Sequence, residues 1–221
     1  NGIYGCDGNS NDTLNESNDG LNIACNWLSW ADGAAYSDWA GLSPMTELEF
    51  EKACRGTLLP VTNEYAWGST SITRASSIVN SKMDNEAASN SAANCNYSVS
   101  GNNLGGPIRV GCFTSGTRQS MGASYYGIME LSGNLWERPV TIGNSTGRSF
   151  TGLNGDGSLD SNGNANVSNW PNAGAVGSGL RGGNWHFNNN AACRVSDRLN
   201  AAVTHNDASS VYGFRSVIRF D

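Results

Sequence analysis

The chain has 221 residues, with 19 Asp and Glu against 13 Lys and Arg and a formal net charge of −6 at pH 7. This length can bury the core of one large domain, which we favour over two small ones. The acidic balance and the lack of any basic run argue against nucleic acid as a partner, and no apolar run reaches the ~20 residues of a membrane helix.

The first third of the chain predicts an irregular leader followed by two helices. Residues 1–22 are polar and rich in Asn, Asp and Gly, so we expect the ordered domain to span 23–221. Residues 29–32 form a capping box that predicts a helix ending at Gly41. A second capping box, at residues 46–49, predicts a helix that ends at Gly56.

Beyond Gly56 the sequence predicts short strands separated by long loops. The loops at 69–105 and 143–179 are rich in Asn, Ser and Gly. The fold class expected is therefore α+β, loop-rich, with two early helices and short antiparallel strands. The strands are predicted at 58–62, 109–113, 127–131, 135–140 and 213–220.

The six cysteines have no C-x-x-C pair, which argues against zinc. Cys6 with Cys25, and Cys95 with Cys112, are the local candidates for disulfides. Buried free thiols are the alternative, and the sequence leaves both open.

The segment from Tyr126 to Glu137 contains a Gly-Asn turn between two glutamates, Glu130 and Glu137. Two carboxylates and turn carbonyls close together could hold Ca²⁺, which takes six to eight oxygen ligands. On the residues alone we favour the alternative, a β-hairpin whose glutamates pair with Arg138 or another arginine.

Near the end of the chain, a segment of unusual composition lies between two glycine-containing blocks. Residues 181–185 (Arg-Gly-Gly-Asn-Trp) precede it, and residues 213–215 (Gly-Phe-Arg) follow it. Between His186 and Tyr212 there is no Lys, Glu, Gln, Met, Trp, Gly or Pro. Small residues between rigid borders indicate a presented surface rather than a core, and we name residues 184–212 the display segment.

Catalytic motifs are scarce in this sequence. The two histidines, His186 and His205, exclude a three-histidine metal site. No Gly-x-Ser-x-Gly elbow, phosphate-binding loop or dinucleotide fingerprint occurs. Cys193 is the one cysteine of the display segment, and we interpret it as a structural thiol.

Several blocks resemble, in order, the signature blocks of the formylglycine-generating (sulfatase-modifying factor) family. They cover about residues 27–219 and comprise 44–56, Tyr-Ala-Trp-Gly at 65–68, 126–137, 181–185 and 213–215. The resemblance implies a loop-rich C-type lectin-like fold. The family's oxidases use copper and a cysteine pair, and here the matching positions are Phe187 and Ala192, so we expect no enzyme and no catalytic cofactor.

The chain is most similar to the variable proteins of diversity-generating retroelements. In these proteins, mutagenised Asn codons never yield Lys, Glu, Gln, Met or Trp, all of which the display segment lacks between His186 and Tyr212. This resemblance implies a non-enzymatic protein that binds a protein or other ligand on a cell surface. We expect it on a virion or a cell surface itself, facing outward. Residues 194–198 would form a fixed strand between two variable patches.

The expected ligand-facing residues lie on both sides of that strand. Phe187, Leu199, Val211 and Tyr212 would be the energetic anchors. The full set is His186, Phe187, Asn188, Asn190, Leu199, Val203, His205, Asp207, Ser209, Val211 and Tyr212.

Two alternatives stay open, and the family adds an expected metal. The chain could be an oxidase that uses Cys193 with a rearranged partner, or a purely structural domain of a virion or surface protein. The family also implies structural Ca²⁺, with Glu130, Gly133, Leu135 and Glu137 at one site and Asn94 at a second.

Overall fold

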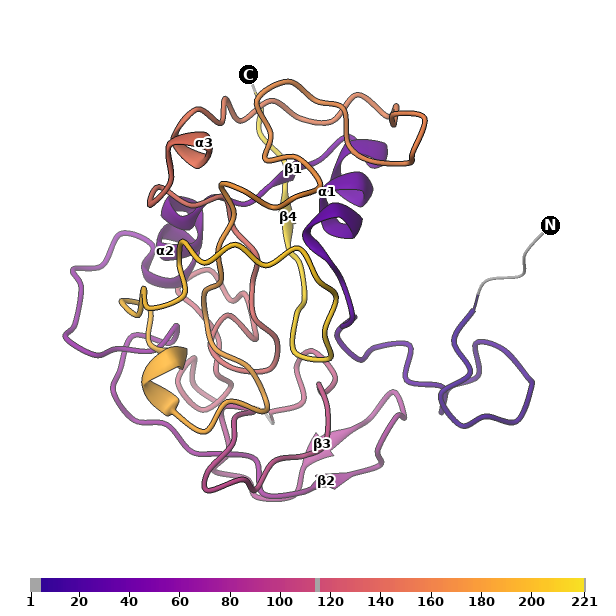
Figure 1. Ribbon diagram of the computed structural model, residues 1–221. Coiled ribbons are helices and arrows are strands. Elements are labelled where there is room, and N and C mark those ends of the chain that lie inside the picture. The colour runs from indigo at the N-terminus through magenta and orange to yellow at the C-terminus, as the bar shows by residue number, and fades with distance from the viewer. Residues whose placement is uncertain (1–4, 114–115, 221) are drawn as a thin grey trace.

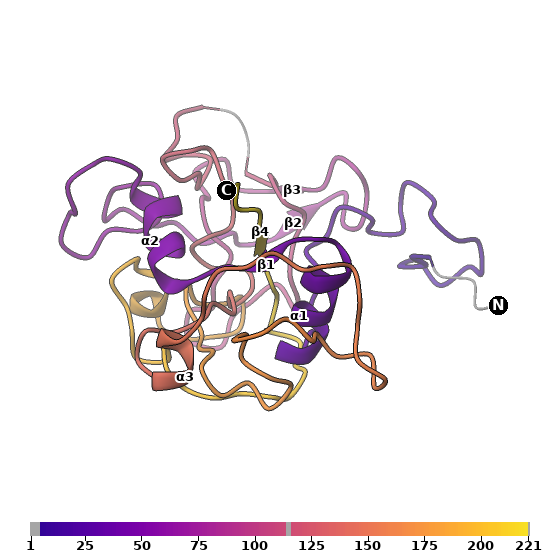
Figure 2. The ribbon, with the colours of Figure 1, turned by 90° about the horizontal axis from the view of Figure 1, so that it is seen from above.

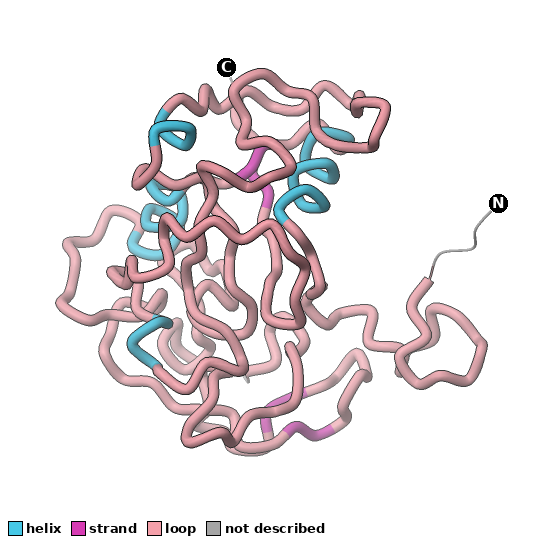
Figure 3. The backbone as a smooth tube through the Cα atoms, viewed as in Figure 1, coloured by secondary structure: helices cyan, strands magenta, loops and turns pink. Residues whose placement is uncertain are grey.

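The computed structural model describes residues 5–113 and 116–220, and most of this backbone is loop (Figure 3). None of the helices within these ranges is long and apolar enough to cross a membrane. The predicted class, a loop-rich α+β fold with short antiparallel strands, is confirmed. The elements are α1 Trp30–Trp39, β1 Ser43–Pro44, α2 Glu47–Arg55, β2 Ile78–Val79, β3 Ala87–Ala88, α3 Ser145–Arg148, the 3-10 helix η1 Asn190–Cys193 and β4 Ser216–Val217.

Both early helices begin at the predicted capping boxes. At α1 the Ser29 hydroxyl accepts from the Asp32 N–H at 3.1 Å, and the Asp32 carboxylate accepts from the Ser29 N–H at 2.8 Å. Thr46 and Glu49 make the same exchange at α2. The helix α2 stops at Gly56, whose φ is 61° and where a Cβ would lie 2.0 Å from the Tyr125 ring. Glycine is therefore required there for both conformation and space.

Residues 5–113 and 116–220 contain two antiparallel strand pairs. β1 pairs with β4, with Ser43 opposite Val217, and β2 pairs with β3. The first pair joins the early part of the chain to its end. It lies between α1 and α2 in both views (Figures 1 and 2).

Most of the predicted strands are wrong in detail. Segments 58–62 and 127–131 contain no strand, and 109–113 and 135–140 contain isolated bridges only. Segment 135–140 is buried throughout, but successive residues pair with different neighbours, so no ladder develops. Trp136 pairs with Tyr212, Glu137 with Arg181, and Val140 with Thr46 and Ser178.

The core is divided into several small clusters. One contains Phe50, Cys54 and Leu131, and another contains Trp30 and Val140. Cys95 and Cys193 share a third cluster, whereas Cys112 lies in a fourth. The cysteines are free thiols, with Cys6 and Cys25 exposed, so neither local disulfide considered from the sequence is formed.

The predicted leader contains no helix or strand within residues 5–22, and Figure 1 shows its first part extending beside the body. Its last part is packed. The Gly20 N–H donates to the Lys82 carbonyl at 2.8 Å, and Asp19 is buried. The last residues of the predicted leader therefore contact the loop around Lys82.

Candidate ligand-binding face

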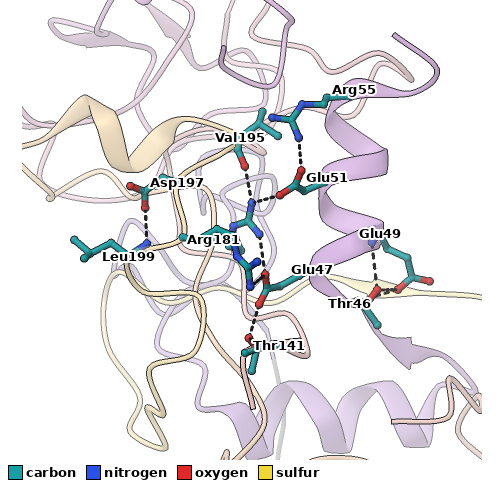
Figure 4. A network of polar contacts seen from close by, with 12 residues as sticks. Thr46, Glu47, Glu49, Glu51, Arg55, Thr141, Arg181, Val195, Asp197 and Leu199 are labelled. Atoms are coloured by element: carbon teal, nitrogen blue, oxygen red, sulfur yellow. Dashed lines mark hydrogen bonds and ion pairs between the residues drawn. The ribbon is translucent and has the colours of Figure 1, made fainter. Parts of the chain in front are cut away.

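Arg181, at the entrance to the display segment, is the centre of a buried ionic network (Figure 4). Its guanidinium contacts Glu47 at 3.1 Å and Glu51 at 2.9 Å, both on α2. It also donates to the Val195 carbonyl at 2.5 Å. Its backbone exchanges two hydrogen bonds with Glu137, both 3.0 Å. One side chain thus joins α2 to the middle of the display segment.

The two glycines after Arg181 allow a close approach of backbones. Gly182 has a φ of 87°, and a Cβ there would lie 2.6 Å from the Leu131 carbonyl oxygen. Gly183 has a φ of 76°, and a Cβ there would lie 2.7 Å from the Cys193 sulfur. Larger residues would be strained and crowded at both positions.

Trp185 connects the two borders of the display segment. Its N–H donates to the Asn134 carbonyl at 2.8 Å, and its indole Nε1 donates to the Ser210 carbonyl at 3.0 Å. The indole is 8% exposed. The start and the end of the display segment are therefore held together through a fixed residue.

Residues 194–198 are held in place by the scaffold, but they do not form the strand that we expected. Val195 is fully buried, and its N–H donates to the Glu64 carbonyl at 2.9 Å. Arg198 contacts the Glu47 carboxylate at 2.8 Å. Because these partners lie on a loop and a helix, the segment is anchored without a neighbouring strand.

Arg138 anchors the second half of the display segment. It is 1% exposed, and its two terminal nitrogens donate to the carbonyls of His205 at 2.6 Å and Asp207 at 2.7 Å. Its guanidinium carbon lies 4.3 Å from the centroid of the Tyr212 ring. Burial lowers the pKa of Arg138, an effect opposed by Tyr212 and Asp207. Of the two options expected from the sequence, a glutamate paired with Arg138 or with another arginine, the structure shows the second, because Glu137 pairs with Arg215 at 2.9 Å.

The expected ligand-facing residues are exposed or half-buried, with one exception. Phe187 is 38% exposed, Leu199 76% and Val203 40%. Tyr212 is 8% exposed, because it packs under Arg138 and against Trp136 and Leu180. Burial raises the pKa of its hydroxyl. Tyr212 is thus not the exposed anchor that the sequence suggested. Its buried ring instead lines a surface cavity.

Part of the expected set converges on one cavity of about 250 Å³. Trp136, Leu180, Asn184 and Asn200 supply the remaining lining. The Nδ1 atom of His205, one of the lining residues, lies 3.5 Å from a carboxylate oxygen of Asp207. The expected residues that line the cavity are His186, Phe187, His205, Val211 and Tyr212.

The other expected residues lie apart from this cavity. Asn188 and Asn190 line a second cavity, of about 360 Å³, together with residues 97–99. Leu199, Val203, Asp207 and Ser209 line neither cavity. The expected ligand-facing residues are therefore divided between two cavities and other surface positions, and they do not line one continuous pocket.

The positions that match the family's cysteine pair differ in environment. Phe187 is exposed and Ala192 is buried. Cys193, next to Ala192, is 1% exposed and packs in one cluster with Cys95. The structure thus gives Cys193 a cysteine neighbour that the sequence did not suggest, and neither thiol lines the two cavities of the display segment.

Two of the residues predicted for the two calcium sites, Asn94 and Glu137, contact other protein groups. Asn94 accepts from the Thr73 N–H at 2.8 Å and donates to the Gln119 carbonyl at 3.0 Å. Glu137 is paired with Arg215 at 2.9 Å. Among the residues that the structure describes, no three His, Cys, Asp or Glu side chains are arranged for a metal. Gly133 packs against residues 95 and 96.

The Glu130 carboxylate, unlike that of Glu137, makes no ion pair with the described residues. It is 6% exposed, and both carboxylate oxygens are buried without a hydrogen-bond partner. Burial raises its pKa from 4.5 to about 8, although nearby Arg215 opposes the shift. With Leu135 and Glu137 it lines a cavity of about 220 Å³. Calcium binding stays a prediction, and Arg215 already neutralises the second carboxylate that it would need.

The sequence did not reveal which buried charged residues anchor the display segment to the rest of the fold. Arg138, Arg181 and Glu47 are all at most 2% exposed. A charged side chain is seldom fully buried unless paired, but a single sequence does not show which arginines are buried. The tight Gly-Gly after Arg181 was the available signal.

Comparison with known families gives a match over most of the chain. The Sulfatase-modifying factor enzyme 1-like domain family matches residues 10–220, which includes part of the expected leader. A search of curated proteins found no match. The resemblance inferred from residues 27–219 is confirmed at the level of the family, and the chain belongs to the Sulfatase-modifying factor enzyme 1-like domain family.

Proposed function

We propose that this protein is a non-enzymatic ligand-binding protein with a C-type lectin-like fold, whose display segment presents exchangeable side chains. A diversity-generating retroelement would supply the exchange. The ligand would be a protein or another group on a cell surface, and the protein would lie on a virion or a cell surface.

The supporting observation concerns the groups that hold the backbone of the display segment. These groups would stay the same when the variable side chains are exchanged. Arg181 and Arg138 lie outside the variable positions, and they bind backbone carbonyls of Val195, His205 and Asp207. Carbonyl acceptors are present whatever the side chain is. Side chains at the expected positions can therefore change while the backbone keeps its partners.

The cavity lined by Phe187, His205 and Tyr212 is suited to one side chain or one sugar-sized group of a ligand. Such hollows of aromatic and polar residues are where interface anchors pack. Leu199 and Val203 add exposed apolar surface beside it.

A library is the direct test. The expected ligand-facing positions other than Tyr212 are randomised, the variants are displayed on phage, and folded members are sorted by protease resistance. They are then selected against two different purified envelope proteins. We expect most members to fold and each target to select its own sequences. A matched library at the buried positions Trp185, Val195 and Ala201 should be largely unfolded. If the first library unfolds as widely as the second, the proposal is wrong.

The second candidate is a copper oxidase that uses Cys193 with Cys95, because the two thiols share one buried cluster. Burial raises the pKa of the Cys95 thiol, which disfavours the thiolate that binds a metal. The protein is incubated with copper and a cysteine-containing peptide, and the product is read by mass spectrometry. Formylglycine in the peptide would favour the oxidase and overturn the binding proposal.

A further inference from the structure

Two thiols that are about a hundred residues apart in sequence meet under the display segment. Cys95 is 0% exposed and Cys193 1% exposed, and both pack with Tyr65 and Trp67. Burial and the neighbouring Cys193 thiol raise the pKa of Cys95. The sulfurs are therefore near neighbours in the folded chain.

Ser132 contacts both cysteines. The Cys95 thiol donates to the Ser132 carbonyl at 3.1 Å, and the Ser132 hydroxyl donates to the Cys193 carbonyl at 2.7 Å. One residue thus contacts the side chain of Cys95 and the backbone of Cys193, which places the two cysteines on either side of it.

Each sulfur occupies space that a glycine leaves open. A Cβ on Gly133 would lie 2.5 Å from the Cys95 sulfur, and a Cβ on Gly183 would lie 2.7 Å from the Cys193 sulfur. Real Cβ atoms essentially never lie so close to another atom. The fold therefore provides room for this sulfur pair on two different segments.

We propose that Cys95 and Cys193 are a cross-linking site, at which a disulfide joins the end of η1 to the scaffold. The two S–H bonds break and one S–S bond forms. A small-molecule disulfide such as oxidised glutathione takes up the two electrons and two protons and is released as two thiols. The inference rests on this sulfur pair and not on the binding function.

The timing of the reaction follows from burial. Exchange needs a thiolate that can reach the incoming disulfide, and both sulfurs are inaccessible once the chain has folded. The bond should therefore form during folding. A protein folded first under reducing conditions should keep both thiols, and a protein that has formed the bond should resist reduction.

The test uses the full chain with the exposed Cys6 and Cys25 changed to Ser, which removes the accessible thiols. The protein is refolded either in a glutathione redox buffer or in dithiothreitol. Free thiols are then alkylated in denaturant, and peptides are mapped by mass spectrometry. We expect one linked peptide pair, Cys95 to Cys193, after refolding in glutathione, and a melting temperature about 10 °C above the reduced form.

The variants Cys54→Ala and Cys112→Ala are matched controls, because both residues are buried in other clusters. Each should keep the linked peptide, whereas Cys95→Ala with Cys193→Ala should lose it and the gain in melting temperature. Alkylation of both thiols after refolding in glutathione, glutathione adducts on them, or a link to Cys54 or Cys112 would each overturn the proposal. The peptide map of the parent chain gives this answer even if a variant fails to fold.

Discussion

The guanidinium of Arg138 packs on the ring of Tyr212, with 4.3 Å between its central carbon and the ring centroid. The same group donates to the carbonyls of His205 and Asp207. The buried guanidinium of Arg138 thus holds the backbone of residues 205–207, which contain no helix or strand.

Replacing Arg138 should destabilise the protein. Arg138→Met leaves two carbonyls without their donors, so we expect a loss of about 3 kcal/mol in the free energy of unfolding. Urea unfolding measures it. Arg148 is exposed and also donates to a carbonyl, that of Ile142 at 2.9 Å, so Arg148→Met is the matched control and should cost less than about 0.5 kcal/mol. Equal losses in the two variants would contradict a special role for Arg138.

The two carboxylates that contact Arg181 should differ in importance. Glu47 has a side chain that is 2% exposed, whereas that of Glu51 is 33% exposed. Glu47→Gln leaves a buried guanidinium partly unpaired and should cost about 3 to 5 kcal/mol. Glu51→Gln should cost about 1 kcal/mol or less, because water screens that pair. Urea unfolding of both variants tests the order, and a reversed order would refute it.

Stability should fall as the pH rises, because of Glu130. Its pKa is about 8 in the folded protein and near 4.5 when exposed, so between these values the unfolded chain releases a proton that the folded chain keeps. The free energy of unfolding should then decrease by a few kcal/mol from pH 4.5 to 8 and level off above 8. Glu130→Gln should remove this part of the pH dependence. Urea unfolding from pH 5 to 9 measures it, and identical profiles would exclude Glu130 as the cause.

Calcium should stabilise the protein if it binds at the site that the family implies. The candidate ligands are the Glu130 carboxylate, whose pKa is raised by burial, and Glu137, which contacts Arg215 at 2.9 Å. We expect millimolar Ca²⁺ to raise the melting temperature at pH 7 by several degrees over EDTA, and Glu130→Gln to abolish this rise. Equal melting temperatures in Ca²⁺ and in EDTA would remove the calcium prediction.

Exposed and buried residues of the display segment should tolerate substitution differently. Leu199 is 76% exposed, so Leu199→Asp should change the free energy of unfolding by less than about 0.5 kcal/mol. Trp185 is 8% exposed and hydrogen-bonded, so Trp185→Ala should cost about 3 to 5 kcal/mol. Thermal melting distinguishes the two. A large loss in Leu199→Asp would place that side chain in the core.

The sequence predicted the helices well and the strands poorly, for a physical reason. A capping box such as Thr46 with Glu49 is a local signal and fixes the start of a helix. A strand depends on a partner that is distant in sequence. Trp136 and Glu137 are adjacent, yet they pair with Tyr212 and Arg181 respectively, which no local pattern reveals.

The same limit applies to the candidate site. The borders of the display segment, Arg181 and Gly213, could be found because their blocks are locally distinctive. That Tyr212 is covered, and that Cys193 meets Cys95 rather than another cysteine, depends on tertiary packing. Composition predicted an exposed segment, but not which of its residues are buried beneath the others.

The carbonyl contacts of Arg138 and Arg181 also bear on affinity. A loop that becomes ordered only on binding loses conformational entropy at that moment, and this loss weakens the complex. Here the backbone at Val195, His205 and Asp207 is held before any ligand arrives. In the function that we propose, each new combination of side chains would start from a preorganised backbone, and a few good contacts would give a measurable dissociation constant without prior optimisation of the loop.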